Sequence, residues 1–154
     1  MQQLMQVWWD NQCEMSQPEI KNIPAKKFYP GIAWFFLILI LVCIPGYDLP
    51  EVDDWLIEIN YDKLIHTGLF AILAYLFMLP VAKSDLPQKE KWNWFFRVAI
   101  ATVLWGITTE FIQKFFVPGR SFTLGDWLAD GLGGVAALLY FKFRRTRAGI
   151  QQRK

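Results

Sequence analysis

FYPGIAWFFLILILVCIPGY, residues 28–47, indicates the class of fold. Its 20 residues carry no charged side chain, and a helix of that length spans about 30 Å, the thickness of a hydrocarbon core. A soluble helix shows a polar stripe every 3.6 residues, whereas residues 32–44 show none. This stretch therefore predicts a first membrane-spanning helix.

Three further apolar stretches follow it. Residues 64–82 are uncharged over 19 residues, with His66 as their one group that ordinarily titrates near neutral pH. Residues 97–116 and 126–141 are the third and fourth candidates, and they are less purely apolar because Glu110, Asp126 and Asp130 lie within them. The sequence predicts an all-α membrane protein, a bundle of four transmembrane helices with short connections and antiparallel neighbours. In the last stretch, small residues predict close helix packing: Gly131, Gly133, Gly134, Ala136 and Ala137.

The remaining segments complete the organisation around a membrane domain of residues 28–142. Residues 1–27 predict a cytosolic or interfacial leader, and not a removable signal peptide, because they lack a basic segment and a small-residue cleavage site. Residues 143–154 predict a basic cytosolic tail. Between the first two spans, Val52–Ile59 has apolar residues at helical spacing with acids on the other side, which predicts a short helix on the outer surface.

Composition excludes several other classes of protein. The 154 residues fit one domain, and 54% hydrophobic against 19% charged residues is too apolar for a disordered chain. A net charge of +2 with 17% aromatic residues argues against nucleic-acid binding. Cys13 lies in a polar segment and Cys43 in an apolar one, which argues against a disulfide framework or a thiolate metal site.

The distribution of charge predicts the orientation. Of the 16 Lys and Arg residues, 13 lie before the first span, around the second connection or in the C-terminal tail, whereas the first connection carries six acids. The positive-inside rule then places both termini in the cytoplasm. Aromatic residues fall at the two expected interfaces, namely Tyr29, Trp92, Trp94 and Tyr140 inside, and Tyr47, Trp55, Tyr61 and Trp127 outside.

Polar residues gather at the outer end of the predicted bundle. They are Asp62, Lys63, His66, Glu110, Gln113, Lys114, Arg120, Asp126 and Asp130. Spacings of three or four residues place each set on one helix face. A charged group inside the hydrocarbon costs at least about 2.5 to 3.5 kcal/mol on insertion scales, so such groups face the bundle interior and find partners. The sequence therefore predicts an outer-facing polar pocket on the second, third and fourth spans.

Individual members of this set have alternative roles. Arg120 follows a Pro-Gly turn, and its planar fork suits bidentate contact with a carboxylate or a phosphate. Asp126 is placed either to cap a helix or to contact a ligand. His66 can be a proton carrier, a metal ligand or a partner of Asp62, and the last of these roles is favoured. For Lys63, extension toward the lipid headgroups is favoured over chemistry.

The polar residues also carry a family resemblance. They are Asp62, Lys63, His66 and Phe70 in YDKLIHTGLF, and Glu110, Gln113, Phe116, Pro118, Arg120, Ser121, Asp126 and Gly133 in TTEFIQKFFVPGRSFTLGDWLADGLGG. In order and spacing, this pattern resembles the VanZ-like family of small integral membrane proteins over about residues 61–135. At the position of Asp130 that family commonly has Asn, so this chain departs from the pattern there.

The resemblance implies a bacterial cytoplasmic-membrane protein with a role in the cell envelope. The founding member of that family is associated with resistance to the glycopeptide teicoplanin. The family offers no settled reaction to carry over, so the resemblance leaves open whether this chain is an enzyme.

The leading hypothesis for function is binding of an anionic lipid or a lipid-linked envelope precursor, which the protein then moves or presents. The substrate-binding set is Asp62, Lys63, His66, Glu110, Gln113, Arg120, Asp126 and Asp130. In this hypothesis Arg120 and Lys63 meet the anionic headgroup. Glu110, Gln113 and His66 orient the neutral polar parts of the ligand. The three aspartates of the set hold Arg120 and Lys63 in place.

Two alternatives belong to other classes. An intramembrane enzyme would act on a lipid with His66 and Glu110 as catalytic candidates, or with a divalent metal held by His66, Glu110 and Asp126. The second alternative is a structural role, in which the polar cluster locks three helices of this protein together and the protein acts as an assembly partner in the envelope. Such a protein would form a homo-oligomer or bind another envelope protein.

Overall fold

The structure, a computed structural model, describes residues 23–45 and 61–151, with side chains up to residue 144. These residues form helices and no strand: η1 (Ala25–Phe28), α2 (Tyr29–Val42), α4 (Tyr61–Ala82), α5 (Gln88–Phe116) and α6 (Leu124–Gln151). The all-α prediction is therefore confirmed for the described part of the chain. The predicted surface helix Val52–Ile59 and residues 1–22 of the predicted leader lie outside it.

Three segments are long and apolar enough to cross a membrane: Ala25–Val42, Tyr61–Ala82 and Gln88–Phe116. They overlap the first three predicted spans, which are uncharged over most of their length. The fourth predicted span lies in α6, whose 28 residues include Asp126, Asp130 and a basic second half. These charged residues make α6 less apolar than the other three helices.

Several helix bounds differ from the predicted spans. α5 begins nine residues before the predicted start at 97, because Pro87 lies at its N-cap and the charged first turns continue the helix beyond the apolar stretch. α6 continues past 141 to Gln151, so most of the predicted tail is helical. α2 ends at Val42 and not at 47, because Pro45 disfavours helical backbone at the preceding residue.

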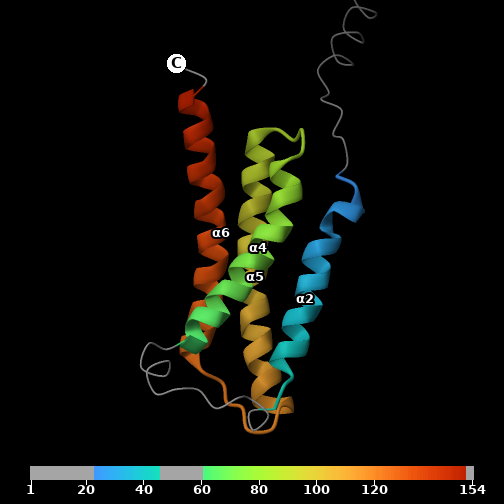
Figure 1. Cartoon of the computed structure of the whole chain (residues 1–154), viewed down its shortest axis with the longest axis vertical. Coiled ribbons are helices and arrows are strands. Elements are labelled where there is room, and N and C mark those ends of the chain that lie inside the picture. The colour runs from blue at the N-terminus through green and yellow to red at the C-terminus, as the bar shows by residue number, and fades with distance from the viewer. Residues whose placement is uncertain (1–22, 46–60, 152–154) are drawn as a thin grey trace, which may run out of the picture.

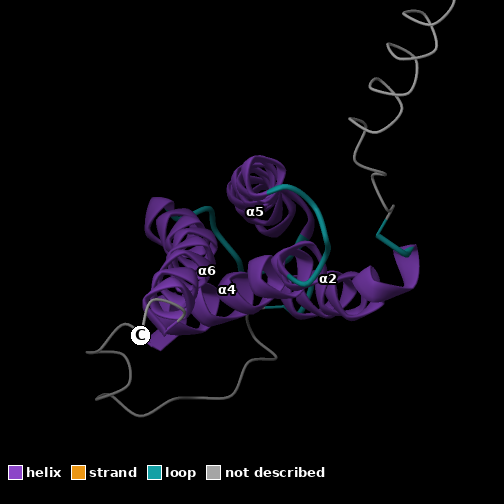
Figure 2. Cartoon of the chain, turned by 90° about the horizontal axis from the view of Figure 1, so that it is seen from above, coloured by secondary structure: helices purple, strands orange, loops and turns teal. Residues whose placement is uncertain are grey.

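The helices alternate in direction along the chain, with α2 and α5 running one way and α4 and α6 the other (Figure 1). α4 is central and contacts α6, α5 and α2 (Figure 2). α2 and α6 make no contact with each other within the described residues. As a result, the ends of α2 and α5 and the starts of α4 and α6 meet at one end of the molecule.

The closest helix contact joins α4 and α6 at Gly133. A Cβ atom added there would lie 2.5 Å from the carbonyl oxygen of Thr67 and 2.7 Å from the amide nitrogen of Ala71. The Thr67 hydroxyl donates to the carbonyl of Ala129 at 3.1 Å, which adds a polar link beside this contact. Among the small residues predicted to pack closely, Gly133 thus has a direct role, and this contact fixes the first turns of α4 and α6 against each other.

Two apolar clusters hold the helices on either side of α4. One joins the far ends of α4, α5 and α6, where the rings of Phe95 and Phe141 stack at 5.2 Å. The other joins Ile38 and Val42 of α2 to Phe70 of α4. Trp34 on α2 also donates its indole N–H to the carbonyl of Leu69 at 2.9 Å. These contacts hold α2 against the first half of α4.

Candidate functional site

The predicted polar residues lie at the end of the molecule where α4 and α6 begin and α5 ends (Figure 1). The connection between α5 and α6 turns sharply at Gly119, whose φ of 73° is in the left-handed region that favours glycine. The backbone N–H of Arg120 donates to the carbonyl of Val117 at 3.3 Å and closes this turn. The turn brings the start of α6 back against the end of α5.

His66 on α4 pairs with Asp130 on α6. Its Nδ1 lies 2.9 Å from Asp130 Oδ1, and the Asp130 side chain is fully buried. The favoured expectation that His66 partners Asp62 is therefore wrong, since Asp62 pairs with Lys63 at 3.2 Å instead. The physical reason is the close α4–α6 contact at Gly133, which places a deeper carboxylate directly beside the imidazole.

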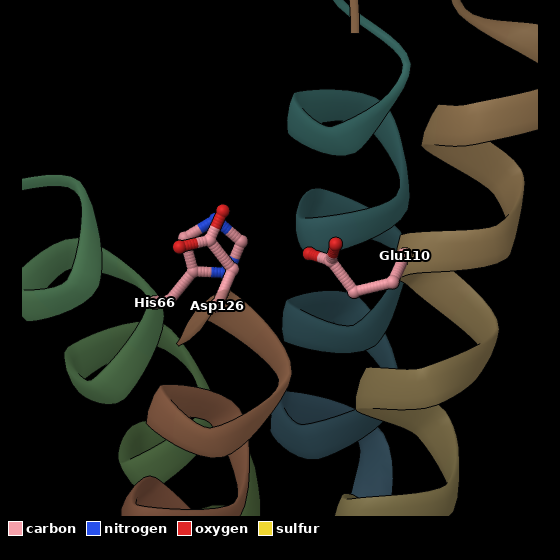
Figure 3. A group of neighbouring side chains, drawn as sticks. All are labelled: His66, Glu110 and Asp126. Atoms are coloured by element: carbon pink, nitrogen blue, oxygen red, sulfur yellow. The ribbon is translucent and has the colours of Figure 1, made fainter. Parts of the chain in front are cut away.

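Glu110 on α5 is fully buried beside this pair. Its Oε2 accepts the backbone N–H of Thr123 at 2.9 Å, which ties α5 to the residue before α6. Its Oε1 is buried and has no hydrogen-bond partner among the described residues. Figure 3 shows the carboxylate pointing toward His66 and Asp126. One buried carboxylate oxygen is thus free to bind a further group.

Asp126 does not cap α6, contrary to one of its two predicted roles. Thr123 precedes the first residue of α6, and its hydroxyl accepts the backbone N–H of Asp126 at 3.4 Å, which is the N-cap interaction. The Asp126 side chain is left for the site, where Oδ1 lies 3.8 Å from Lys63 Nζ. That oxygen is buried and accepts no hydrogen bond from the described residues.

The three predicted metal candidates come together from three helices. One ring nitrogen of His66 and one carboxylate oxygen each of Glu110 and Asp126 lie within 4.8 Å of one another (Figure 3). These residues are 44 and 16 positions apart in sequence. We call this group, together with Asp130, the carboxylate–histidine cluster.

A cavity of about 250 Å³ adjoins the cluster at His66. One wall is apolar and includes Ile38, Leu41, Val42 and Leu69. Its polar lining consists of Tyr61, Asp62, His66, Gln113 and Arg120. The predicted pocket used the second, third and fourth spans, but this cavity lies between α2, α4, α5 and the connection to α6. We call it the α2–α4–α5 cavity.

Arg120 is a cation of the site that has no ionic partner among the described residues. Its side chain is partly buried, and its Nε is buried without a hydrogen-bond partner in the described residues. No acidic side chain of the described residues lies within 4.0 Å of its guanidinium group. Its charge is therefore available to a ligand in the α2–α4–α5 cavity.

The remaining predicted cation, Lys63, is not among the residues that line this cavity. It pairs with Asp62 and approaches Asp126, with its side chain 42% exposed. Lys114 is exposed and lies against the ring of Phe115 at 5.3 Å, outside both cavity and cluster. Sequence reasoning missed Thr123, although the Thr-x-x-Asp spacing from Thr123 to Asp126 is a recognisable helix start.

A second cavity, of about 260 Å³, lies at the opposite end of the molecule. Its lining includes Lys83, Lys91 and Arg144 and none of the predicted site residues.

In comparisons with known proteins, no family model, no curated protein and no solved structure matches this chain. The geometry of the described residues therefore carries the functional argument.

Proposed function

We propose that this protein binds an anionic lipid or a lipid-linked envelope precursor in the α2–α4–α5 cavity, with the headgroup at Arg120. One observation carries the proposal: Arg120, partly buried and without an acidic partner among the described residues, lines a cavity that is apolar on its α2 side. Apolar walls with a few convergent polar groups are typical of ligand pockets. An amphiphile with an anionic headgroup matches both the apolar wall and the positive charge of Arg120.

The size of the cavity limits which part of the ligand it holds. Pockets for drug-sized ligands have volumes of roughly 300 to 1,000 Å³. About 250 Å³ suits a headgroup and the start of an acyl or prenyl chain, and the rest of the chain would lie in the bilayer. Leu41 lines the cavity and is 37% exposed on α2, so the apolar wall continues to the surface that lipid would cover.

The polar lining favours a phosphate over a carbohydrate as the anchoring group. A guanidinium group binds phosphate oxygens through two parallel N–H bonds, and such charge-assisted bonds are roughly twice as strong as neutral ones. Gln113 and His66 can bond to neutral oxygens beside that phosphate. Asp62, the one carboxylate among the described residues that line the cavity, pairs with Lys63 and not with Arg120.

The placement in the membrane is part of this proposal. α6 presents an apolar stripe of exposed residues at helical spacing, Leu128, Leu132, Val135 and Leu139. Asp130 and Ala137 are buried on the other side of α6. We therefore place α6 as a fourth crossing, and the positive-inside rule places both termini in the cytoplasm and the cavity on the outer side.

The resemblance to VanZ-like proteins belongs to the same proposal. A lipid-linked precursor bound at the outer face is an envelope component, and glycopeptides such as teicoplanin act at the envelope. A resistance-like role would follow if the protein moved or presented such a precursor in the bacterial cytoplasmic membrane.

Lipid titration tests the headgroup contact. We expect Arg120→Ala to weaken binding of short-chain phosphatidylglycerol by about 10- to 100-fold, because hydrogen bonds to charged groups contribute roughly 1.5–3 kcal/mol each. Microscale thermophoresis of the detergent-solubilised protein measures this change. Arg97→Ala is the matched control, since it removes an exposed positive charge near the other end of α5.

The same titration with short-chain phosphatidylcholine reports the specificity for charge. We expect wild type to bind phosphatidylcholine more weakly than phosphatidylglycerol. Arg120→Ala should bind the two lipids with about equal affinity. Equal phosphatidylglycerol affinity in wild type and Arg120→Ala would contradict the proposed site.

A second candidate function is an intramembrane enzyme acting on the bound lipid. The observation that favours it is the His66–Asp130 pair, which faces two further carboxylates beside the cavity. A histidine oriented by a carboxylate is a general acid–base arrangement. Thin-layer chromatography after incubation with the bound lipid would show a released phosphate or acyl product, and an unchanged lipid argues for binding alone.

A further inference from the structure

Within the carboxylate–histidine cluster, the donor atoms of His66, Glu110 and Asp126 lie within 4.8 Å of one another. They belong to α4, α5 and α6 (Figure 3). A tetrahedral ion with bonds of about 2.1 Å needs donor atoms roughly 3.4 Å apart. Small side-chain rotations would bring these three groups to that spacing.

The unsatisfied oxygens of the cluster point to a missing cation. Glu110 is 0% exposed, and its Oε1 has no hydrogen-bond partner in the part of the chain that the structure describes. Asp126 Oδ1 is also buried without a hydrogen bond from the described residues, and Lys63 Nζ remains 3.8 Å away. Buried polar atoms without partners are rare in native proteins, and one cation between them would satisfy both.

His66 is oriented as a metal ligand. A carboxylate accepts hydrogen bonds, so in the neutral imidazole the 2.9 Å contact with Asp130 assigns the proton to Nδ1 and leaves the lone pair on Nε2. Metal-binding histidines commonly donate their other N–H to a carboxylate in this way, which fixes the ring and raises its basicity. Asp130 is therefore a positioning residue for His66.

We propose that His66, Glu110 and Asp126 bind one zinc ion at the edge of the α2–α4–α5 cavity. Zinc accepts imidazole nitrogen and carboxylate oxygen together, whereas Mg²⁺ and Ca²⁺ prefer oxygen ligands alone. The cluster contains three carboxylates and only one imidazole, so its buried negative charge exceeds any positive charge on the histidine. A divalent cation would balance this excess. Three protein ligands leave the fourth coordination position of a tetrahedral zinc ion open. His66 lines the cavity, so this open position would lie beside it.

Equilibrium dialysis tests this site independently of any lipid. Tag-free protein is stripped with EDTA and dialysed against ZnCl₂, and the bound metal is measured by mass spectrometry. We expect one zinc per chain and a rise in the unfolding temperature with zinc concentration. Affinity should be lower for MnCl₂, in accord with the Irving–Williams order.

Two conservative variants remove one ligand each. We expect Glu110→Gln and Asp126→Asn to weaken zinc binding by at least about tenfold. The side-chain amide introduced by Glu110→Gln keeps an oxygen that can accept the Thr123 N–H, so this variant retains the link between α5 and α6. Asp85→Asn changes an exposed acid in the connection from α4 to α5 and should leave zinc affinity unchanged.

Asp130→Asn tests the positioning role of Asp130. It leaves all three ligands in place and should weaken zinc binding by about 10- to 100-fold at unchanged stoichiometry. A wild-type chain without bound zinc, or equal zinc affinity in wild type and Glu110→Gln, would overturn the proposal.

Cobalt provides a second readout that does not require any variant to fold. Co²⁺ in wild-type protein should give the visible absorption of a tetrahedral nitrogen–oxygen site. A thiolate-to-cobalt band would instead place the ion at a cysteine, such as the exposed Cys43, and would equally overturn the site.

Discussion

His66→Leu should lower the free energy of unfolding by about 3 to 5 kcal/mol, the range measured when a buried charge loses its partner. The leucine cannot pair with Asp130, which is fully buried and whose Oδ2 already lacks a hydrogen-bond partner among the described residues. Thermal and denaturant unfolding of the EDTA-treated protein in detergent would measure the loss without any contribution from metal.

A double variant separates the lost pair from lost packing. In His66→Leu/Asp130→Asn, the orphaned charge is replaced by a neutral amide of the same shape, so we expect at least half of the lost stability to return. If the double variant is as unstable as His66→Leu, packing around the imidazole and not the buried carboxylate sets the cost.

This pair also bears on the structural alternative, in which the cluster serves only to lock the helices. That alternative expects every change in the cluster to lower the unfolding temperature before any binding changes. Glu110→Gln or Arg120→Ala protein that keeps the wild-type unfolding temperature but loses its ligand would count against it.

The second large effect is expected for Gly133→Ala. Its Cβ would approach the backbone of α4 at Thr67 to 2.5 Å, and backbone atoms cannot rotate away as a flexible side chain can. We expect α4 and α6 to separate and the free energy of unfolding to fall by about 3 kcal/mol, at the upper end of the usual overpacking cost.

Gly68→Ala is the matched control on the facing helix. An added Cβ at Gly68 meets nothing within 4 Å among the described residues, and alanine favours a helix over glycine by about 0.8–1 kcal/mol. The same melting experiment should therefore show a small gain for Gly68→Ala. Similar melting temperatures for the two variants would mean that α4 and α6 are not in backbone contact at Gly133.

The sequence is most informative where one physical requirement dominates. Absence of charge over residues 28–47 and 64–82 predicts two membrane-spanning segments, and both are confirmed as helices apolar enough to cross a membrane. The clustering of polar residues at one end also follows from sequence, because alternating helices bring His66, Glu110 and Asp126 to the same depth.

Other features depend on packing that sequence does not reveal. His66 pairs with Asp130 and not with Asp62 because Gly133 allows α4 and α6 to approach closely, and spacing along one helix cannot show this. The contribution of α2 to the cavity was missed for a related reason. Ile38 and Val42 resemble any other apolar residues of a membrane-spanning helix until their neighbours are known.

Native mass spectrometry of the gently solubilised protein, compared with its Arg120→Ala and Arg97→Ala variants, would detect the proposed lipid directly. We expect a defined anionic-lipid adduct on wild type and Arg97→Ala that is absent from Arg120→Ala at equal unfolding temperature. Bare wild-type protein, or the same adduct on all three proteins, would contradict the assignment of the α2–α4–α5 cavity as a site for an anionic lipid headgroup.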